Sequence, residues 1–85
     1  MINFMEQDTL KKVTDLISFM LNIPVNKIRP FTSLKDDLLL DAIDVTLLIA
    51  ALESKFDVYL SPEEAESIQT VQDITLLLQK NAVAA

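Results

Sequence analysis

The segment "DDLLLDAID", residues 36–44, concentrates carboxylates that could take part in acid–base chemistry: Asp36, Asp37, Asp41 and Asp44. The rest of the sequence offers them no catalytic partner. The chain has no His and no Cys, so it lacks the usual general base near neutral pH and any thiol nucleophile. It has no Gly, which removes the glycine-rich loops that cradle phosphates. We therefore expect neither an enzyme nor a metal site.

Two of these carboxylates fit the start of an apolar helix predicted over residues 42–56. Asp41 is a good N-cap, and Asp44 falls at the third helical position, where a carboxylate favours the positive end of the helix dipole. One stripe of this helix is predicted to face the core: Val45, Leu48, Ile49, Leu52 and Phe56. A second stripe is either more core or an exposed docking strip: Ile43, Leu47, Ala50 and Ser54.

A first helix and a long loop are predicted ahead of this segment. Apolar residues at three- and four-residue spacing predict an amphipathic helix over residues 8–22, capped by Asp8 or Thr9. The loop that follows contains Pro24 and Pro30, which disfavour helical backbone before them. We expect a short turn at 33–38 and a loop fixed to the core by four side chains: Ile23, Val25, Ile28 and Phe31.

Two more helices are predicted after residue 60. Ser61, Pro62 and Glu64 are typical of an N-cap, a first helical residue and a capping-box acid, and they predict a very short third helix. Thr70 begins the last helix, with Asp73 at its third position. The pattern predicts an all-α four-helix bundle in a single domain over 1–85, with its core at about 9–80 and a frayed tail at 81–85.

The charge balance limits the partners. Seven basic against thirteen acidic residues give a net charge of −6, which argues against nucleic acid binding. The charge either favours partners with a basic docking patch or only keeps a small protein soluble. We see no secretory signal and no run long and apolar enough to span a membrane, and we expect a cytoplasmic protein that is monomeric alone.

These elements together resemble an acyl carrier protein over roughly residues 9–80. The family's motif is "DLGxDSLD" at the start of its second helix, followed by an "ALExxFD" pattern. This chain has "DLLLDAID" at 37–44 and then "AALESKFDVYLSPEEAESIQTVQDI" at 50–74. The second half matches the family in order and spacing, whereas the first helix and the loop match in pattern only.

The resemblance implies a site at the start of the second helix. The family's serine, which carries 4′-phosphopantetheine and through it an acyl thioester, falls at Ala42, where a methyl group cannot accept the phosphodiester. The family's usual glycine falls at Leu39, which implies a different turn or one without positive φ. The resemblance implies docking of biosynthetic enzymes such as a ketosynthase, an acyltransferase or a phosphopantetheinyl transferase at Asp41, Ile43, Asp44, Leu47 and Glu53. It also implies an acyl-chain cavity among Leu48, Leu52, Ile68 and Leu77.

Three explanations of Ala42 follow. The first is a carrier for fatty-acid, polyketide or related thioester biosynthesis in which a Ser-to-Ala change blocks loading, and the intact neighbours Asp41 and Ile43 favour it. The second is a natural pseudo-carrier that serves as a non-covalent docking module. It is favoured by Leu39 and by Leu47, Ser54 and Lys55 at positions where the family often has Glu. The third is an unrelated helical adaptor.

Overall fold

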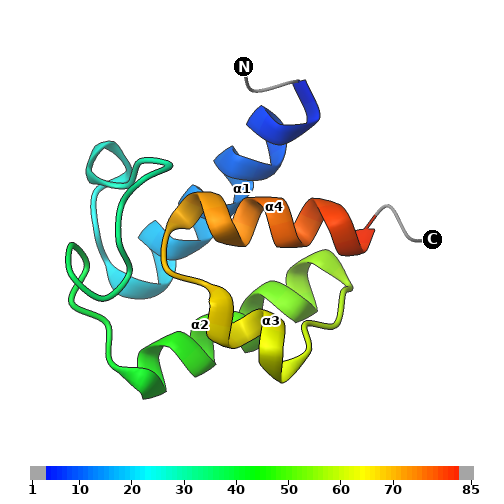
Figure 1. Ribbon diagram of the computed structural model, residues 1–85. Helices are drawn as coiled ribbons and strands as arrows, with labels where there is room; N and C mark the ends of the chain where they lie inside the picture. Colours follow the sequence, from blue (N-terminus) through cyan, green and yellow to red (C-terminus); the bar gives the residue numbers. More distant parts are fainter. Residues whose placement is uncertain (1–3, 83–85) are drawn as a thin grey trace.

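The computed structural model describes residues 4–82, which form a small bundle of α-helices (Figure 1). The elements are α1 (Phe4–Leu21), the 3-10 helix η1 (Val25–Lys27), α2 (Ala42–Phe56), α3 (Pro62–Ser67) and α4 (Val71–Ala82). The predicted all-α architecture, with a long loop before the second helix and a very short third helix, is confirmed. Within residues 4–82, no helix has both the length and the apolar character needed to cross a membrane.

The core lies where α1 packs against α4 and α2 (Figure 1). Its largest fully buried apolar side chains are Val13, Ile17, Leu48, Leu52, Val71, Ile74 and Leu78. Burial of each such side chain contributes roughly 1.5–3 kcal/mol, so these few contacts supply most of the driving force available to a chain of this size. α1, α2 and α4 therefore each contribute fully buried side chains to one core.

Side-chain caps determine where three of the helices begin. In each case the side chain of the residue before the helix accepts the backbone N–H of the third helical residue, and the side chain of that residue accepts the backbone N–H in return. The pairs are Asp41–Asp44, Ser61–Glu64 and Thr70–Asp73. Each cap stabilises its helix by about 1 kcal/mol. The predicted starts of α2, α3 and α4 are confirmed.

The predicted start of the first helix is wrong. α1 begins at Phe4 and not after Asp8 or Thr9. Asp8 instead lies inside the helix and pairs with Lys12, one turn later, at 3.2 Å. The residues just before Asp8 include no helix breaker, so a good cap in the sequence does not end the helix there. At the other end, α4 includes the first two residues of the predicted tail, and 83–85 lie outside the described residues.

The long loop is fixed to the start of α4 by backbone hydrogen bonds. The N–H of Leu34 donates to the carbonyl of Gln69 at 3.0 Å, and the N–H groups of Val71 and Gln72 donate to carbonyls of the loop. The predicted turn is present, because the N–H groups of Asp37 and Leu38 both donate to the Ser33 carbonyl.

The side chains that anchor this loop differ in part from the prediction. Ile28 is buried and Ile23 is half-buried, as expected. Val25 and Phe31 are exposed, and Leu34 and Leu40 take their place in the core. Periodicity is a weak guide in a loop, because backbone turns decide which side chains point inward.

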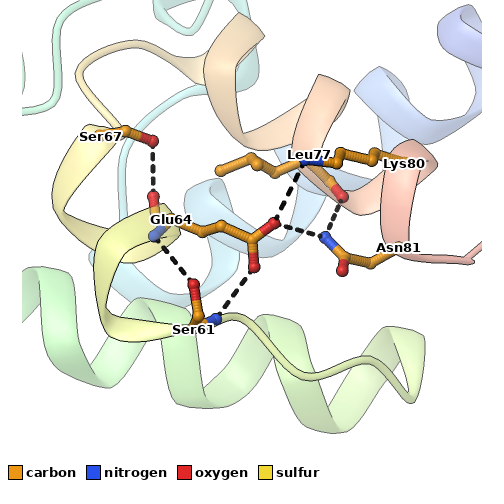
Figure 2. A network of polar contacts seen from close by, with 6 residues as sticks. All are labelled: Ser61, Glu64, Ser67, Leu77, Lys80 and Asn81. Carbon is orange, nitrogen blue, oxygen red and sulfur yellow. Dashed lines mark hydrogen bonds and ion pairs between the residues drawn. The ribbon is translucent and has the colours of Figure 1, made fainter.

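A polar network holds α3 against the C-terminal end of α4 (Figure 2). The Glu64 carboxylate accepts hydrogen bonds from the Ser61 backbone N–H at 3.0 Å and from the Asn81 side-chain amide at 3.3 Å. The Lys80 ammonium lies 3.9 Å from the same carboxylate. The Ser61 N–H, and then the Asn81 amide, hold the pKa of Glu64 below its ordinary value of 4.5. One side chain therefore both starts α3 and links it to α4.

The network predicts that Glu64 makes stability depend on pH. Because its folded pKa is lowered, the ionised carboxylate stabilises the fold above pH 4.5, and this contribution is lost as the pH falls through the folded pKa. Glu64→Gln should be less stable than the unmodified chain at pH 7, and the difference should shrink as the pH falls below 4.5 and through the lowered pKa of Glu64. Urea unfolding of both chains at a series of pH values measures this difference in the free energy of unfolding.

The matched control is Glu66→Gln, which removes an exposed carboxylate from the same helix. It should give a smaller loss of stability at pH 7, because no hydrogen bond or ion pair of the described residues involves the Glu66 side chain. A Glu64→Gln deficit that stays constant from pH 7 down to the acid unfolding of the chain would contradict the assignment of this network.

Candidate functional site

The start of α2 is a rigid, solvent-facing corner. Asp41 has extended backbone, with φ −92° and ψ −178°, and its Oδ1 accepts the N–H of Asp44 at 2.8 Å. In return, Asp44 Oδ2 accepts the N–H of Asp41 at 3.2 Å. Ala42 is the first helical residue and is exposed. The reciprocal cap therefore presents the side chain of residue 42 to solvent in a defined position.

The hydroxyl groups of Ser33 and Thr46 line the same surface groove as Ala42, which is described below, and both form hydrogen bonds with backbone atoms. The Thr46 hydroxyl donates to the Ala42 carbonyl at 2.8 Å, within the helix. Ser33 Oγ accepts the Asp36 N–H at 3.0 Å and so stabilises the loop turn. Both hydroxyls therefore stabilise the local backbone structure.

An open groove of about 810 Å³ is lined by Ala42 and by residues of the loop, α2 and α3. Its apolar lining consists of Leu34, Leu40, Ala42, Val45, Ile49, Ala65 and Ile68. Polar side chains, among them Lys35, Asp36 and Glu66, complete the lining. Apolar and polar side chains therefore line this groove together, next to residue 42.

The structure separates the residues expected to line an acyl-chain cavity. Ile68 lines the groove. Leu48 and Leu52 are fully buried in the core, and Leu77 lines a separate hollow beside α4. Val45 and Ile49, which we had placed only in the core stripe, line the groove together with Ala42. Their spacing of three and seven residues from Ala42 puts them on its helix face, and that signal was present in the sequence.

The second stripe of α2 faces solvent. Ile43 is 70% and Leu47 57% exposed, and Ala50 and Ser54 are also exposed. The stripe is therefore exposed and not part of the core. Glu53, expected to dock partners, points back to the chain, since its Oε2 accepts the Leu60 N–H at 2.9 Å.

The backbone at Leu39 differs from the sequence expectation. Leu39 has φ 57°, so the turn into α2 does adopt the left-handed conformation that favours glycine. The other described non-glycine residues with positive φ are Asn22 and Asp57, whose side chains tolerate this region. Leucine does not, and the conformation costs it about 1–2 kcal/mol. The turn buries the next residue, Leu40, and leaves Leu39 79% exposed.

Comparison with known proteins agrees with this geometry. The model of the phosphopantetheine attachment site family matches residues 11–78. The chain is 44% identical over 73 residues to an acyl carrier protein of Syntrophobacter fumaroxidans, covering 86% of this chain and 90% of that protein. It is 47% identical over 62 residues to an acyl carrier protein of Buchnera aphidicola, covering 73% of this chain and 78% of that protein.

Solved structures share the fold. An acyl carrier protein from Enterococcus faecalis superposes with a TM-score of 0.75 at 32% identity, over 89% of this chain and 96% of that one. The fold of an acyl carrier protein from Thermotoga maritima gives a TM-score of 0.82 at 21% identity, over 96% of this chain and 95% of that one.

A short four-helix bundle with an exposed, capped position at the start of its second helix defines a carrier-type fold. The family match and the level of identity establish that this chain belongs to the acyl carrier proteins. These proteins carry acyl intermediates tethered to phosphopantetheine, and biosynthetic enzymes are their partners. They are not catalysts, so the prediction that this chain is not an enzyme is confirmed.

The positive φ of Leu39 generates a stability prediction. Leu39→Gly removes the steric cost of the left-handed conformation and adds the entropy cost of glycine, for a net gain of about 0.5 kcal/mol in the free energy of unfolding. The matched control, Leu47→Gly, replaces another exposed leucine inside α2 and should lose about 1 kcal/mol. Urea unfolding at pH 7 compares the two. A loss of about 1 kcal/mol or more on Leu39→Gly would contradict the strained turn.

Proposed function

We propose that this chain is an acyl carrier protein whose attachment position, residue 42, is not loaded with 4′-phosphopantetheine. One observation carries the proposal: the exposed, capped first residue of α2 is an alanine. A phosphodiester link requires a side-chain oxygen, and a methyl group supplies none. The residues at the start of α2 therefore do not fit the covalent group of the family.

The surroundings of Ala42 support this position as the attachment point. The first turn of α2 is capped and solvent-facing, and the positive end of a helix dipole favours an anionic phosphate. The groove beside residue 42 has apolar side chains in its lining, among them Val45 and Ile49, which could contact a chain held there. Only the reactive oxygen is missing from an otherwise suitable site.

Two explanations of the alanine remain, and each has its own support. The intact reciprocal cap between Asp41 and Asp44 supports a carrier of a fatty-acid, polyketide or related thioester pathway in which Ser-to-Ala blocks loading. The exposed strip on α2 and the strained Leu39 support the second candidate, a pseudo-carrier that docks partners without covalent chemistry. In both cases the chain acts as one domain over residues 1–85.

Restoring the hydroxyl tests the proposal. Ala42→Ser is incubated with coenzyme A and a phosphopantetheinyl transferase of broad carrier range, and intact masses are taken. We expect one phosphopantetheine adduct, because the cap presents residue 42 outward and the substitution adds a single oxygen. The fold should be retained, with a stability change of about 0.5 kcal/mol or less.

Two controls locate the adduct. The double variant Ala42→Ser, Ser33→Ala should still be loaded, because it keeps the hydroxyl at residue 42. The hydroxyl that it loses, that of Ser33, stabilises the loop turn and is not the proposed attachment point. The unmodified chain should remain bare in the same reaction. Failure of folded Ala42→Ser to load would sink the blocked-carrier explanation, and loading of the unmodified chain would move the attachment site away from residue 42.

A further inference from the structure

We propose that the exposed side chains of residues 19–35 bind the surface of an anionic lipid membrane. In this contact Phe19 and Phe31 enter the interface, and Lys27 and Arg29 pair with lipid phosphates. We call this surface the basic end. The inference goes beyond the proposed function, because it does not depend on whether residue 42 is loaded.

The charges of this acidic chain are distributed unevenly along the sequence. Residues 16–35 contain no Asp or Glu and include three basic residues, Lys27, Arg29 and Lys35. All thirteen acidic residues and the other four basic ones lie outside this stretch. The three cations are exposed, and the ion pairs between the side chains that the structure describes use other lysines. They are therefore available to an anionic surface outside the chain.

The two most exposed large apolar side chains of the described residues lie in the same stretch. Phe19, in the last turn of α1, is 86% exposed, and Phe31, in the loop, is 82% exposed. Val25 adds a half-exposed side chain in η1, which packs against α1. Exposed aromatic rings beside cations are typical of surfaces that lie in a membrane interface, where the rings leave water and the cations meet anionic headgroups.

Phe31 is exposed because the backbone around it is fixed. The Arg29 N–H donates to the Thr32 hydroxyl at 2.8 Å, and the Thr32 N–H donates to the Arg29 carbonyl at 3.1 Å, which closes a turn. The carbonyls on either side of Phe31 accept N–H groups from the first turn of α4, at 2.8 and 3.2 Å. The ring therefore projects from a fixed turn, and its burial elsewhere costs little further backbone entropy.

The arrangement of the basic end favours a lipid surface over a protein pocket. Figure 1 shows the loop between α1 and α2, in cyan to green, at the side of the bundle away from the C-terminal end of α4. A ring that projects from a turn needs no shaped pocket in a lipid interface, because lipids rearrange around it. The cations beside it are complementary to anionic headgroups.

The acidic remainder of the chain opposes this contact only weakly. The bundle measures 33 × 28 × 19 Å, whereas the Debye length is about 10 Å at 0.1 M salt. Charges on the far side of the bundle are therefore screened from the membrane. Few rings and few cations take part, so the attachment should be reversible and sensitive to salt.

Flotation with lipid vesicles measures the binding. The unmodified chain should bind vesicles of about 40% phosphatidylglycerol in phosphatidylcholine at least about tenfold more strongly than vesicles of phosphatidylcholine alone. The double variant Lys27→Gln, Arg29→Gln should lose about tenfold or more, and Phe19→Ser and Phe31→Ser should each lose about fivefold or more. Raising the salt from about 50 to about 300 mM should weaken binding about fivefold or more.

Two matched controls alter similar side chains elsewhere. Lys55→Gln removes an exposed lysine from the last turn of α2, and Tyr59→Ser removes a 71% exposed aromatic ring from the loop before α3. That loop lies on the other side of the bundle (Figure 1). Both variants should bind the anionic vesicles within about twofold of the unmodified chain. Circular dichroism verifies that every variant is folded.

Insertion of the ring can be observed directly, because the chain has no Trp. Phe31→Trp places a single indole at the basic end, and its emission should shift to shorter wavelength when anionic vesicles are added. Tyr59→Trp is the matched control, and its emission should not shift. This measurement separates entry into the interface from attraction by charge alone.

Several results would overturn the inference. They are equal binding to both kinds of vesicle, no binding at about 1 mM anionic lipid, or binding that none of the substitutions at the basic end weakens. A Phe31→Trp emission that does not shift would overturn it too. Retention of the chain on immobilised polyglutamate, lost in Lys27→Gln, Arg29→Gln and accompanied by no vesicle binding, would assign the basic end to an acidic polypeptide instead.

Discussion

The reciprocal hydrogen bonds between Asp41 and Asp44 are the interaction on which the rest of the site depends. They fix the residue at which α2 begins and therefore which side chain occupies its first exposed position. A start one residue earlier or later would rotate every side chain of the helix by about 100° relative to the preceding loop. The core face, the groove face and the exposed strip would then no longer coincide with the residues that suit them.

The turn before this cap shows how a chain without glycine solves a problem that usually needs one. Asn22 and Asp57 adopt positive φ at helix ends, where their side chains tolerate it. Leu39 adopts it because the backbone must turn so that Leu40 enters the core directly before the cap. The local cost of about 1–2 kcal/mol is offset by the burial of Leu40 and by the helix start that follows.

The helices, apart from the start of α1, could be predicted from the sequence, whereas the surface of the site could be predicted only in part. Capping residues and apolar periodicity act locally, so Asp41 and Ser61 were enough to locate two helix starts. The conformation of Leu39 could not be predicted, because it follows from the packing of its neighbour and not from its own preference. The inward turn of Glu53 was missed for a similar reason, since its partner, the Leu60 N–H, is presented by a later loop.

We propose above that this carrier fold is not loaded, because Ala42 offers no side-chain oxygen at the attachment position. The most direct test is the intact mass of the unmodified chain after co-expression with a phosphopantetheinyl transferase in cells supplied with isotope-labelled pantothenate. We expect the mass of the bare polypeptide and no label. A labelled phosphopantetheine adduct on any residue of this chain would contradict it.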